Sequence, residues 1–165
     1  MCANLASAYI QGGNFAAAIE HARKALIFFQ QIGNSFSIAL NASNLAEAHA
    51  QLDQLSEAQH YAELVLQQEE PHSHPYAFFT LGVVQQKRQQ QQQAELYFAQ
   101  SRQLAQMNRD RFLLAYACRS LGEVYLAQGQ ADPANQALQE ALSLFREMGI
   151  QDEIAKTEKL LESGT

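Results

Sequence analysis

The stretch SLGEVYLAQGQADPANQALQEAL, residues 120–142, decides the fold of this chain. In its first half, Leu121, Val124 and Tyr125 recur at the spacing that places side chains on one face of a helix. Gly129 follows, and glycine readily adopts the left-handed backbone conformation that ends a helix. The first half of the stretch therefore predicts a short amphipathic helix with a defined stop.

The second half of the stretch predicts a second helix. We expect Asp132 to cap it, because a short acceptor side chain satisfies free N–H groups of the first turn. Pro133 would then occupy the first helical position, where a missing N–H has no cost. Gly122 and Ala134 have the smallest side chains, so we expect the two helices to approach closely there. The apolar stripe of the second helix consists of Ala134, Ala137, Leu138, Ala141 and Leu142.

The same block occurs three more times, at residues 4–26, 44–66 and 80–102. Its leading leucines are separated by 40, 36 and 40 residues, and they are Leu5, Leu45, Leu81 and Leu121. The alanine column of the second helix keeps the same register, with Ala18, Ala58, Ala94 and Ala134. Chance would not hold both columns at once, so the chain is predicted to be a helical repeat protein.

The pattern resembles that of the tetratricopeptide repeat (TPR) family, which has a Leu-Gly pair, an aromatic residue, a Gly-polar turn and two alanines around a large residue. The second copy departs from it at His49 and Asp53, and the third at Gln85, Gln89 and Ser101. The fourth copy fills it with Leu121, Gly122, Tyr125, Gly129, Ala134, Leu138 and Ala141. The resemblance implies a right-handed superhelix of helical hairpins whose concave face binds peptides or other proteins. The 40-residue period also resembles the TPR regions of bacterial multidomain regulators.

We therefore expect an all-α fold, an α-solenoid that forms a single domain over residues 1–165. Asn14 is an expected helix cap, as is Asn108 or Asp110 further along. Ser56 and Gln59 have the spacing of a capping box. Four hairpins are expected at residues 1–33, 34–70, 71–107 and 108–149, with a terminal helix at 150–165.

The start of the chain predicts an uncovered end. No capping residue precedes the first helix, so we expect the chain to be part of a longer array. The apolar face around Ala6, Tyr9 and Ile10 would then be exposed, and exposed end repeats tend to self-associate. Self-association through the first repeat is therefore a further prediction.

Composition argues against two classes of partner. The net charge of −6 does not suit a nucleic-acid surface, which needs clustered Lys and Arg. No run approaches the roughly 18 apolar residues of a membrane helix, and no export signal is visible. Cys2 and Cys118 share a column three repeats apart, too far for a disulfide. We expect reduced thiols in a cytoplasmic protein that contacts neither nucleic acid nor membrane.

No catalytic, metal or cofactor signature is visible in the sequence, such as a P-loop, HExxH or CxxC. His72 and His74 lie in a proline-rich connector, but no Cys or carboxylate stands at ligand spacing, so an exposed loop is the better interpretation. His49 and His21 fall in columns that hold aromatic rings in other copies. We predict that the protein is not an enzyme and that it binds no metal or cofactor.

The candidate binding residues lie on the face of each first helix that the TPR resemblance places in the concave groove. Aromatic side chains facing a groove are suitable anchors, and asparagine amides can hold a peptide backbone. Tyr76, Tyr116 and Lys156 share one column at a spacing of 40 residues, and a second column lies three residues further along each helix. The groove is thus expected to change from aromatic to basic toward its C-terminal end. The candidates are Asn4, Asn44, Tyr76, Phe79, Thr80, Tyr116, Arg119, Glu123, Lys156 and Lys159.

These features predict a non-catalytic protein–protein interaction module that binds a peptide or protein segment. The resemblance suggests the sensor or scaffold region of a larger bacterial regulatory protein, with a role in signalling or transcription regulation. Two alternatives remain open, a co-chaperone-like adaptor and a domain that senses a small molecule or signal peptide. Some chaperone-tail-binding TPR domains clamp a carboxylate with Lys and Asn. Asn44 lies in a comparable column here, but Ala3 stands where the lysine of the first repeat would be.

Overall fold

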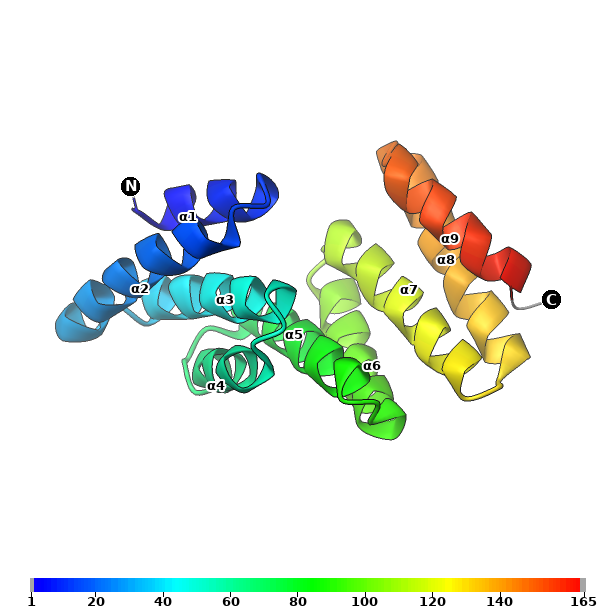
Figure 1. The fold of residues 1–165 in the computed structure, drawn as a ribbon, viewed down its shortest axis with the longest axis horizontal. Helices are drawn as coiled ribbons and strands as arrows, with labels where there is room; N and C mark the ends of the chain where they lie inside the picture. The colour runs from blue at the N-terminus through cyan, green and yellow to red at the C-terminus, as the bar shows by residue number, and fades with distance from the viewer. Residues whose placement is uncertain (1, 164–165) are drawn as a thin grey trace. The chain divides into compact units, whose positions relative to one another are not determined.

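The computed structural model of the protein describes residues 2–163, and for residues 2–4 it describes the backbone alone. Within that range the chain forms nine α-helices and one short 3-10 helix, and it contains no strand (Figure 1). The predicted all-α fold is therefore confirmed. The chain divides into two compact units, residues 1–84 and 85–165, with the boundary inside α5 (His74–Lys87). The single domain expected from the sequence stays a prediction.

The first unit is built from antiparallel helices that pack in chain order. Helices α1 and α2, α2 and α3, and α3 and α4 are in contact, and α1 also reaches α3. The connector with the two histidines is not a loop, because a 3-10 helix runs into α5 and Pro75 is fully buried there. The elements are α1 (Cys2–Gln11), α2 (Phe15–Ile32), α3 (Ser35–Gln51), α4 (Leu55–Leu66), η1 (Pro71–Ser73) and the first part of α5.

The second unit repeats this arrangement and ends with an unpaired helix. Consecutive helices again pack against each other, from α6 through to α9. Its elements are the end of α5, α6 (Gln91–Met107), α7 (Arg111–Ala127), α8 (Ala131–Met148) and α9 (Gln151–Ser163). The helix pairs thus occur where the repeat pattern predicts them.

Several helix ends follow their local sequence signals. The Oδ1 atom of Asn14 accepts a hydrogen bond from the Ala17 N–H at 3.2 Å, and Asp110 caps α7 through the Leu113 N–H at 3.0 Å. Gly33 ends α2 with a positive φ of 67°. These residues confirm the predicted caps, with Asp110 rather than Asn108 before α7.

Two predicted caps are wrong. Helix α8 begins at Ala131, so Asp132 lies inside its first turn and Pro133 is the third helical residue. Helix α4 begins at Leu55, so Ser56 is already helical, and no side chain caps this end. The described structure contains no capping box there, since the Gln59 amide bonds Glu63 instead.

The turn backbone explains both differences. In each turn between paired helices one residue has a positive φ, and the next helix begins two residues later. Gly129 at 73° fixes the start of α8 in this way, and Asp53 at 61° fixes the start of α4. Gln89 and Arg109 adopt the same conformation with φ values of 61° and 58°. The turn geometry, more than the residue that could cap, sets where each helix begins.

The alanine column forms the packed interior of the helix pairs. Its members Ala18, Ala58, Ala94 and Ala134 are all fully buried. The close approach predicted at Gly122 is confirmed, because a Cβ atom placed there would lie 2.5 Å from Leu138 Cγ. Glycine is required at this position by the large residue opposite it.

Aromatic rings and one thiol complete the interior. His49 is buried and stacks on Tyr61 with ring centroids 5.4 Å apart, and Tyr9 stacks on His21 at 5.2 Å. Both histidines therefore pack as rings, as their columns predict. Cys118 is a buried free thiol, and its burial raises its pKa to about 12.

The exposed apolar face predicted for the first helix is mostly covered. Ala6 is fully buried against α2 and α3, and Tyr9 and Ile10 are half-buried. Leu5 of that helix remains 41% exposed. The prediction was wrong for these three residues because α3 as well as α2 packs against α1.

Candidate binding surface

The candidate residues divide between the two units. Asn4 belongs to α1, but its side chain lies outside the described residues. Asn44, Tyr76, Phe79 and Thr80 lie in the first unit, and the five remaining candidates lie in the second. The predicted approach of the aromatic pair in α5 to Tyr116 and Arg119 therefore stays a prediction.

In the first unit, helices α1 and α3 meet at a polar contact. Ser7 Oγ donates a hydrogen bond of 3.3 Å to Asn44 Oδ1, and Asn44 is only 7% exposed. Three neighbouring polar atoms on α3 have no hydrogen-bond partner among the described residues, namely Asn44 Nδ2, Ser43 Oγ and Asn41 Oδ1. Buried polar groups are usually paired, so three unpaired atoms within four residues are unusual.

The α5 candidates of the first unit differ in exposure. Tyr76 is 43% exposed, whereas Phe79 is half-buried and Thr80 is buried. An aromatic ring of which nearly half reaches solvent can still gain contacts from a ligand. Tyr76 is accordingly better placed as an anchor than Phe79 or Thr80.

In the second unit, α7 presents a continuous stripe of aromatic and charged side chains. The Phe112 and Tyr116 rings lie 4.8 Å apart, and the Arg119 guanidinium lies 5.3 Å from the Tyr116 ring centroid. Tyr116 also packs edge-on against Phe145 at 5.1 Å, so it is half-buried in the core of this unit. Phe112 is 52% exposed at the end of the stripe, and the sequence analysis missed it.

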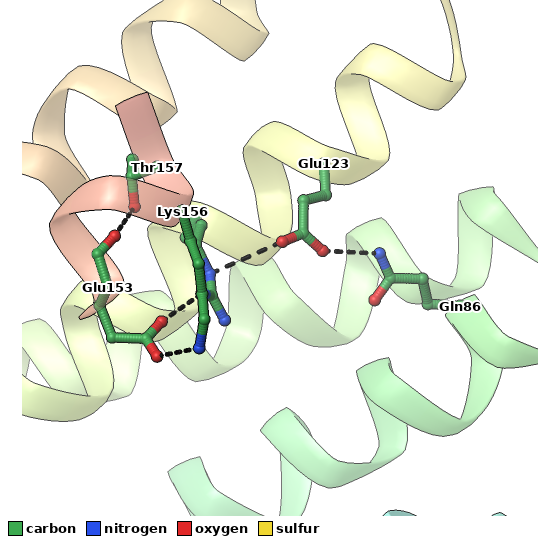
Figure 2. Close-up of polar contacts among 6 residues, drawn as sticks. Gln86, Glu123, Glu153, Lys156 and Thr157 are labelled. Atoms are coloured by element: carbon green, nitrogen blue, oxygen red, sulfur yellow. Dashed lines mark hydrogen bonds and ion pairs between the residues drawn. The ribbon is translucent and has the colours of Figure 1, made fainter. Parts of the chain in front are cut away.

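Glu153 of α9 holds two of the predicted cations (Figure 2). It forms an ion pair with Arg119, and Lys156 Nζ lies 2.7 Å from its Oε1 atom. The Glu153 side chain is only 10% exposed, and its backbone carbonyl accepts a hydrogen bond of 2.7 Å from Thr157 Oγ1. Leu113 fills the equivalent position one repeat earlier and is buried. A glutamate at the position that holds a buried leucine one repeat earlier was the signal that could have revealed this partner.

Glu123 adds a second carboxylate to the cluster. Its Oε1 atom lies 3.6 Å from Arg119 Nε, and its Oε2 atom accepts a hydrogen bond of 3.2 Å from Gln86 Nε2 (Figure 2). Within the described residues, Lys159 is the only candidate cation of this cluster without a carboxylate partner. The end of the groove predicted to be basic is therefore largely neutralised.

Four of the candidates line one hollow between α7 and α9. Its volume is about 370 Å³, and its lining residues are Arg119, Glu123, Lys156, Lys159, Leu160 and Ser163. The structure thus brings together the charged candidates of the second unit. A larger hollow of about 990 Å³ lies elsewhere, at the turns that precede α6 and α8, and contains none of the candidates. Its lining is Gln89, Gln90, Gln91, Gln92, Gln93, Glu95, Gln128 and Gln130.

The described residues form neither a metal site nor a membrane-spanning helix. Residues 2–163 contain no group of three or more His, Cys, Asp or Glu side chains that could hold a metal ion. No helix in the same range is long and apolar enough to cross a membrane. Of the places where polar side chains gather, the α1–α3 contact and the α7–α9 hollow are the two that contain candidate residues.

Helices paired in antiparallel fashion and repeated along the chain define a helical-repeat protein. The family model for the tetratricopeptide repeat matches residues 1–26, which hold most of the first predicted hairpin, in agreement with the resemblance seen in the sequence. Among curated proteins, none is significantly similar to this chain.

Solved structures of repeat proteins share the fold. One is a signal transduction ATPase with numerous domains (STAND) from Pyrococcus horikoshii, which has a tetratricopeptide repeat sensor. It is 14% identical to this chain, with a TM-score of 0.75, and the match covers 99% of this chain and 26% of that protein. Another is BtubC (BKLC) from P. vanneervenii, with 16% identity and a TM-score of 0.70 over 97% and 75%. A third, from Podosopora anserina, is described as a kinesin light chain with nearly identical TPR-like repeats; it has 19% identity and a TM-score of 0.68 over 98% and 86%.

These likenesses establish the fold. The chain spans about a quarter of the length of the Pyrococcus protein, so that protein's other parts have no counterpart in it. Tetratricopeptide repeats are generally non-catalytic modules for protein–protein interaction or scaffolding.

Proposed function

We propose that this chain is a non-catalytic interaction module that binds a peptide or protein segment along the face formed by the first helix of each pair. The observation that carries the proposal is the group of three unpaired polar atoms on α3, from Asn41, Ser43 and Asn44. A second polar feature of the same helix class is the hollow between α7 and α9.

The chemistry of the α3 group suits a peptide backbone. Asn44 Nδ2 is a donor, Asn41 Oδ1 is an acceptor, and the Ser43 hydroxyl can act as either. A peptide unit offers one carbonyl acceptor and one N–H donor, which complement this set. Leaving such a buried group unpaired costs about 1–3 kcal/mol, and a ligand that supplies the missing partner removes that cost. Asn41 is fully buried and Asn44 is 7% exposed, so the side chains must rearrange for a ligand to reach these atoms.

The α7–α9 hollow favours a segment with little net charge. Arg119 and Lys156 are already paired with Glu153, so an acidic ligand would have to displace that carboxylate. The exposed ring of Phe112 offers an apolar contact on the same helix, about two turns before Arg119. A neutral segment with an apolar side chain therefore fits this end better than an acidic segment would.

The experiment is a selection of binding peptides from a random library on the immobilised chain, followed by calorimetry with the selected peptides. Asn44→Ala and Tyr76→Ala should each weaken binding by about tenfold or more, the usual effect of removing a central contact. Asn135→Ala on α8 is the matched control, since it lies on a second helix and should bind as wild type. If no peptide is selected, or if both variants bind like wild type, this face is not the binding surface.

The biological setting belongs to the same proposal. The chain would serve as the sensor or scaffold region of a larger cytoplasmic regulator that acts in signalling or transcription. The likeness to a STAND protein with a tetratricopeptide repeat sensor favours this setting over a co-chaperone adaptor. The neighbouring domains of the full-length protein test it: the absence of any regulatory or nucleotide-binding domain beside the array would contradict it.

A further inference from the structure

Helix α2 and the start of α3 carry an exposed apolar patch that the proposed binding face does not use. Four large side chains within ten residues are each more than half exposed. They are Ile27 (53%), Phe28 (55%), Ile32 (57%) and Phe36 (58%), which we call the α2 patch. Contiguous exposed apolar side chains on a soluble domain commonly mark an interaction site.

The repeat pattern does not explain Ile27, whereas the position of Phe28 also holds a large apolar residue in two other repeats, Leu104 and Leu144, where it is half-buried. In the other three repeats the position of Ile27 is also exposed, but there it is polar, with Gln67, Gln103 and Ser143. These three positions stay exposed although each has a preceding repeat. A further repeat before α1 would therefore leave Ile27 in solvent as well. The apolar residue at this position in the first repeat requires a different explanation.

We propose that the α2 patch binds the α2 patch of a second copy of this chain, forming a two-fold symmetric dimer. The charge around the patch fits this occupant. Between Glu20 and Glu47 the sequence contains no acidic residue, so the contact buries no carboxylate. The nearby cations, Arg23 and Lys24, lie about one turn before the patch on the same helix. An apolar surface without charges at its centre is complementary to itself, as a two-fold interface must be.

An antiparallel arrangement of the two α2 helices places these cations favourably. If Phe28 of one copy lies opposite Ile32 of the other, Lys24 lies level with the C-terminal end of the opposite helix, just beyond Gly33. Cations are stabilised there by the helix dipole. The two Lys24 side chains are then twelve residues apart along the axis, about 18 Å, which exceeds the Debye length of about 8–10 Å at physiological salt.

The size of the patch predicts a reversible dimer. Four half-exposed side chains present roughly 400 Å² of apolar surface per copy, judged from the area of large side chains. A standard interface buries about 800 Å² per partner, so the patch forms the core, and the polar residues that surround it form the rim. Association should accordingly depend on protein concentration.

Sedimentation velocity of the full chain over about 1 to 200 µM tests the proposal, because mass action separates monomer from dimer over such a range. The 18.4 kDa wild type should approach twice its mass at the upper end. Ile27→Gln with Phe28→Gln places the residues of Gln67 and Gln68 on α2, and should weaken association by about tenfold or more, since each copy loses both contacts. Leu96→Gln on α6, which is 59% exposed in the wild type, should associate as wild type. Circular dichroism should show unchanged helicity for all variants, because glutamine is a good helix former.

A disulfide experiment locates the contact. In a Cys2→Ser background, Gln31→Cys places a thiol near the two-fold axis and should give a covalent dimer on mild oxidation. Ala16→Cys lies about 40 Å from its counterpart in the antiparallel arrangement and should not. The buried Cys118 thiol does not compete. A wild type that stays monomeric at every concentration overturns the proposal. So does a double variant that dimerises like wild type, or a Gln31→Cys chain that gives no more covalent dimer than Ala16→Cys.

Discussion

Replacing Gly122 by alanine should destabilise the second unit, although alanine is the better helix former. Gly122 lies within α7 and faces Leu138 of α8. A Cβ atom at residue 122 would lie 2.5 Å from Leu138 Cγ, 2.6 Å from its Cδ2 and 3.4 Å from the Ala134 carbonyl oxygen. Leu138 is fully buried, so it has no free space into which it could move.

The magnitude follows from two opposing effects. Alanine is favoured over glycine by about 1 kcal/mol in a helix interior. Overpacking a well-packed core costs about 1–3 kcal/mol, and two carbon contacts below 3 Å belong to the upper part of that range. We therefore expect Gly122→Ala to lower the free energy of unfolding by about 1–2 kcal/mol.

The other repeats suggest a rescue. The positions equivalent to Gly122 and Leu138 hold Ala6 with Ala22 in the first repeat, and two alanines again in the second. In a Leu138→Ala background, which itself costs about 2–5 kcal/mol, Gly122→Ala recreates that pair. Its effect should then reverse and become stabilising by up to about 1 kcal/mol.

Urea unfolding followed by circular dichroism measures all four chains of this double-mutant cycle. Gly12→Ala is the matched control, since a Cβ atom there would meet nothing closer than 3.4 Å and should be neutral or slightly stabilising. If Gly122→Ala raises stability in the wild-type background, or if its effect is the same in both backgrounds, the close contact with Leu138 does not constrain the helix pair.

Three further outcomes are expected. Gln89→Gly should raise the thermal midpoint, because glycine relieves the positive φ of 61° and adds about 0.5–1 kcal/mol to the free energy of unfolding. Gly129→Gln at the equivalent turn should lower the midpoint, and midpoints that move in the same direction would refute this. Arg119→Ala should destabilise α9 by about 1–3 kcal/mol, because it removes the principal partner of the nearly buried Glu153 carboxylate. Hydrogen-exchange protection of α9 should fall accordingly, and adding Glu153→Leu should restore most of it. Equal protection in the single and double variants would contradict the role of the ion pair. Burial raises the pKa of Cys118 to about 12, so at pH 8 iodoacetamide should label it only as fast as the protein unfolds, and rapid labelling without denaturant would show an accessible thiol.

The repeat columns made most of the fold predictable. A leucine and an alanine column at constant spacing require the same helix pair each time, because both columns must be buried together. Asn14 and Asp110 could be recognised as caps because each stands directly after a turn. In each case the cap is the residue that directly follows the positive-φ residue of the turn. Gly13 and Arg109 place Asn14 and Asp110 there, whereas Asp53 and Gly129 place Gln54 and Gln130 there. Asp132 and Ser56 were misjudged for that reason, since capping preference was weighed without the turn geometry.

The candidate surface was predictable only in part. Helical period placed Arg119, Glu123 and the α9 lysines on one face, and they do line one hollow. The period says nothing of which charges neutralise one another, so Glu153 was missed even though it holds two of the cations. Phe112 was missed because it is the second residue of α7 and lies one turn before the aromatic column that contains Tyr116. Pairing depends on side-chain reach across helices, which a single sequence does not encode directly.

The position of Glu153 couples order at the end of the chain to occupancy of the hollow. Its carboxylate joins α9 to α7 through Arg119, and that same guanidinium lines the space a ligand would enter. An anion that takes the guanidinium for itself must release Glu153, and α9 then loses the tie that spans α8. By reciprocity, any contact that holds α9 in place weakens such an anion by the same factor. Hydrogen exchange at the backbone amides of α9 therefore reports whether an anion occupies the hollow, and the ligand itself needs no label.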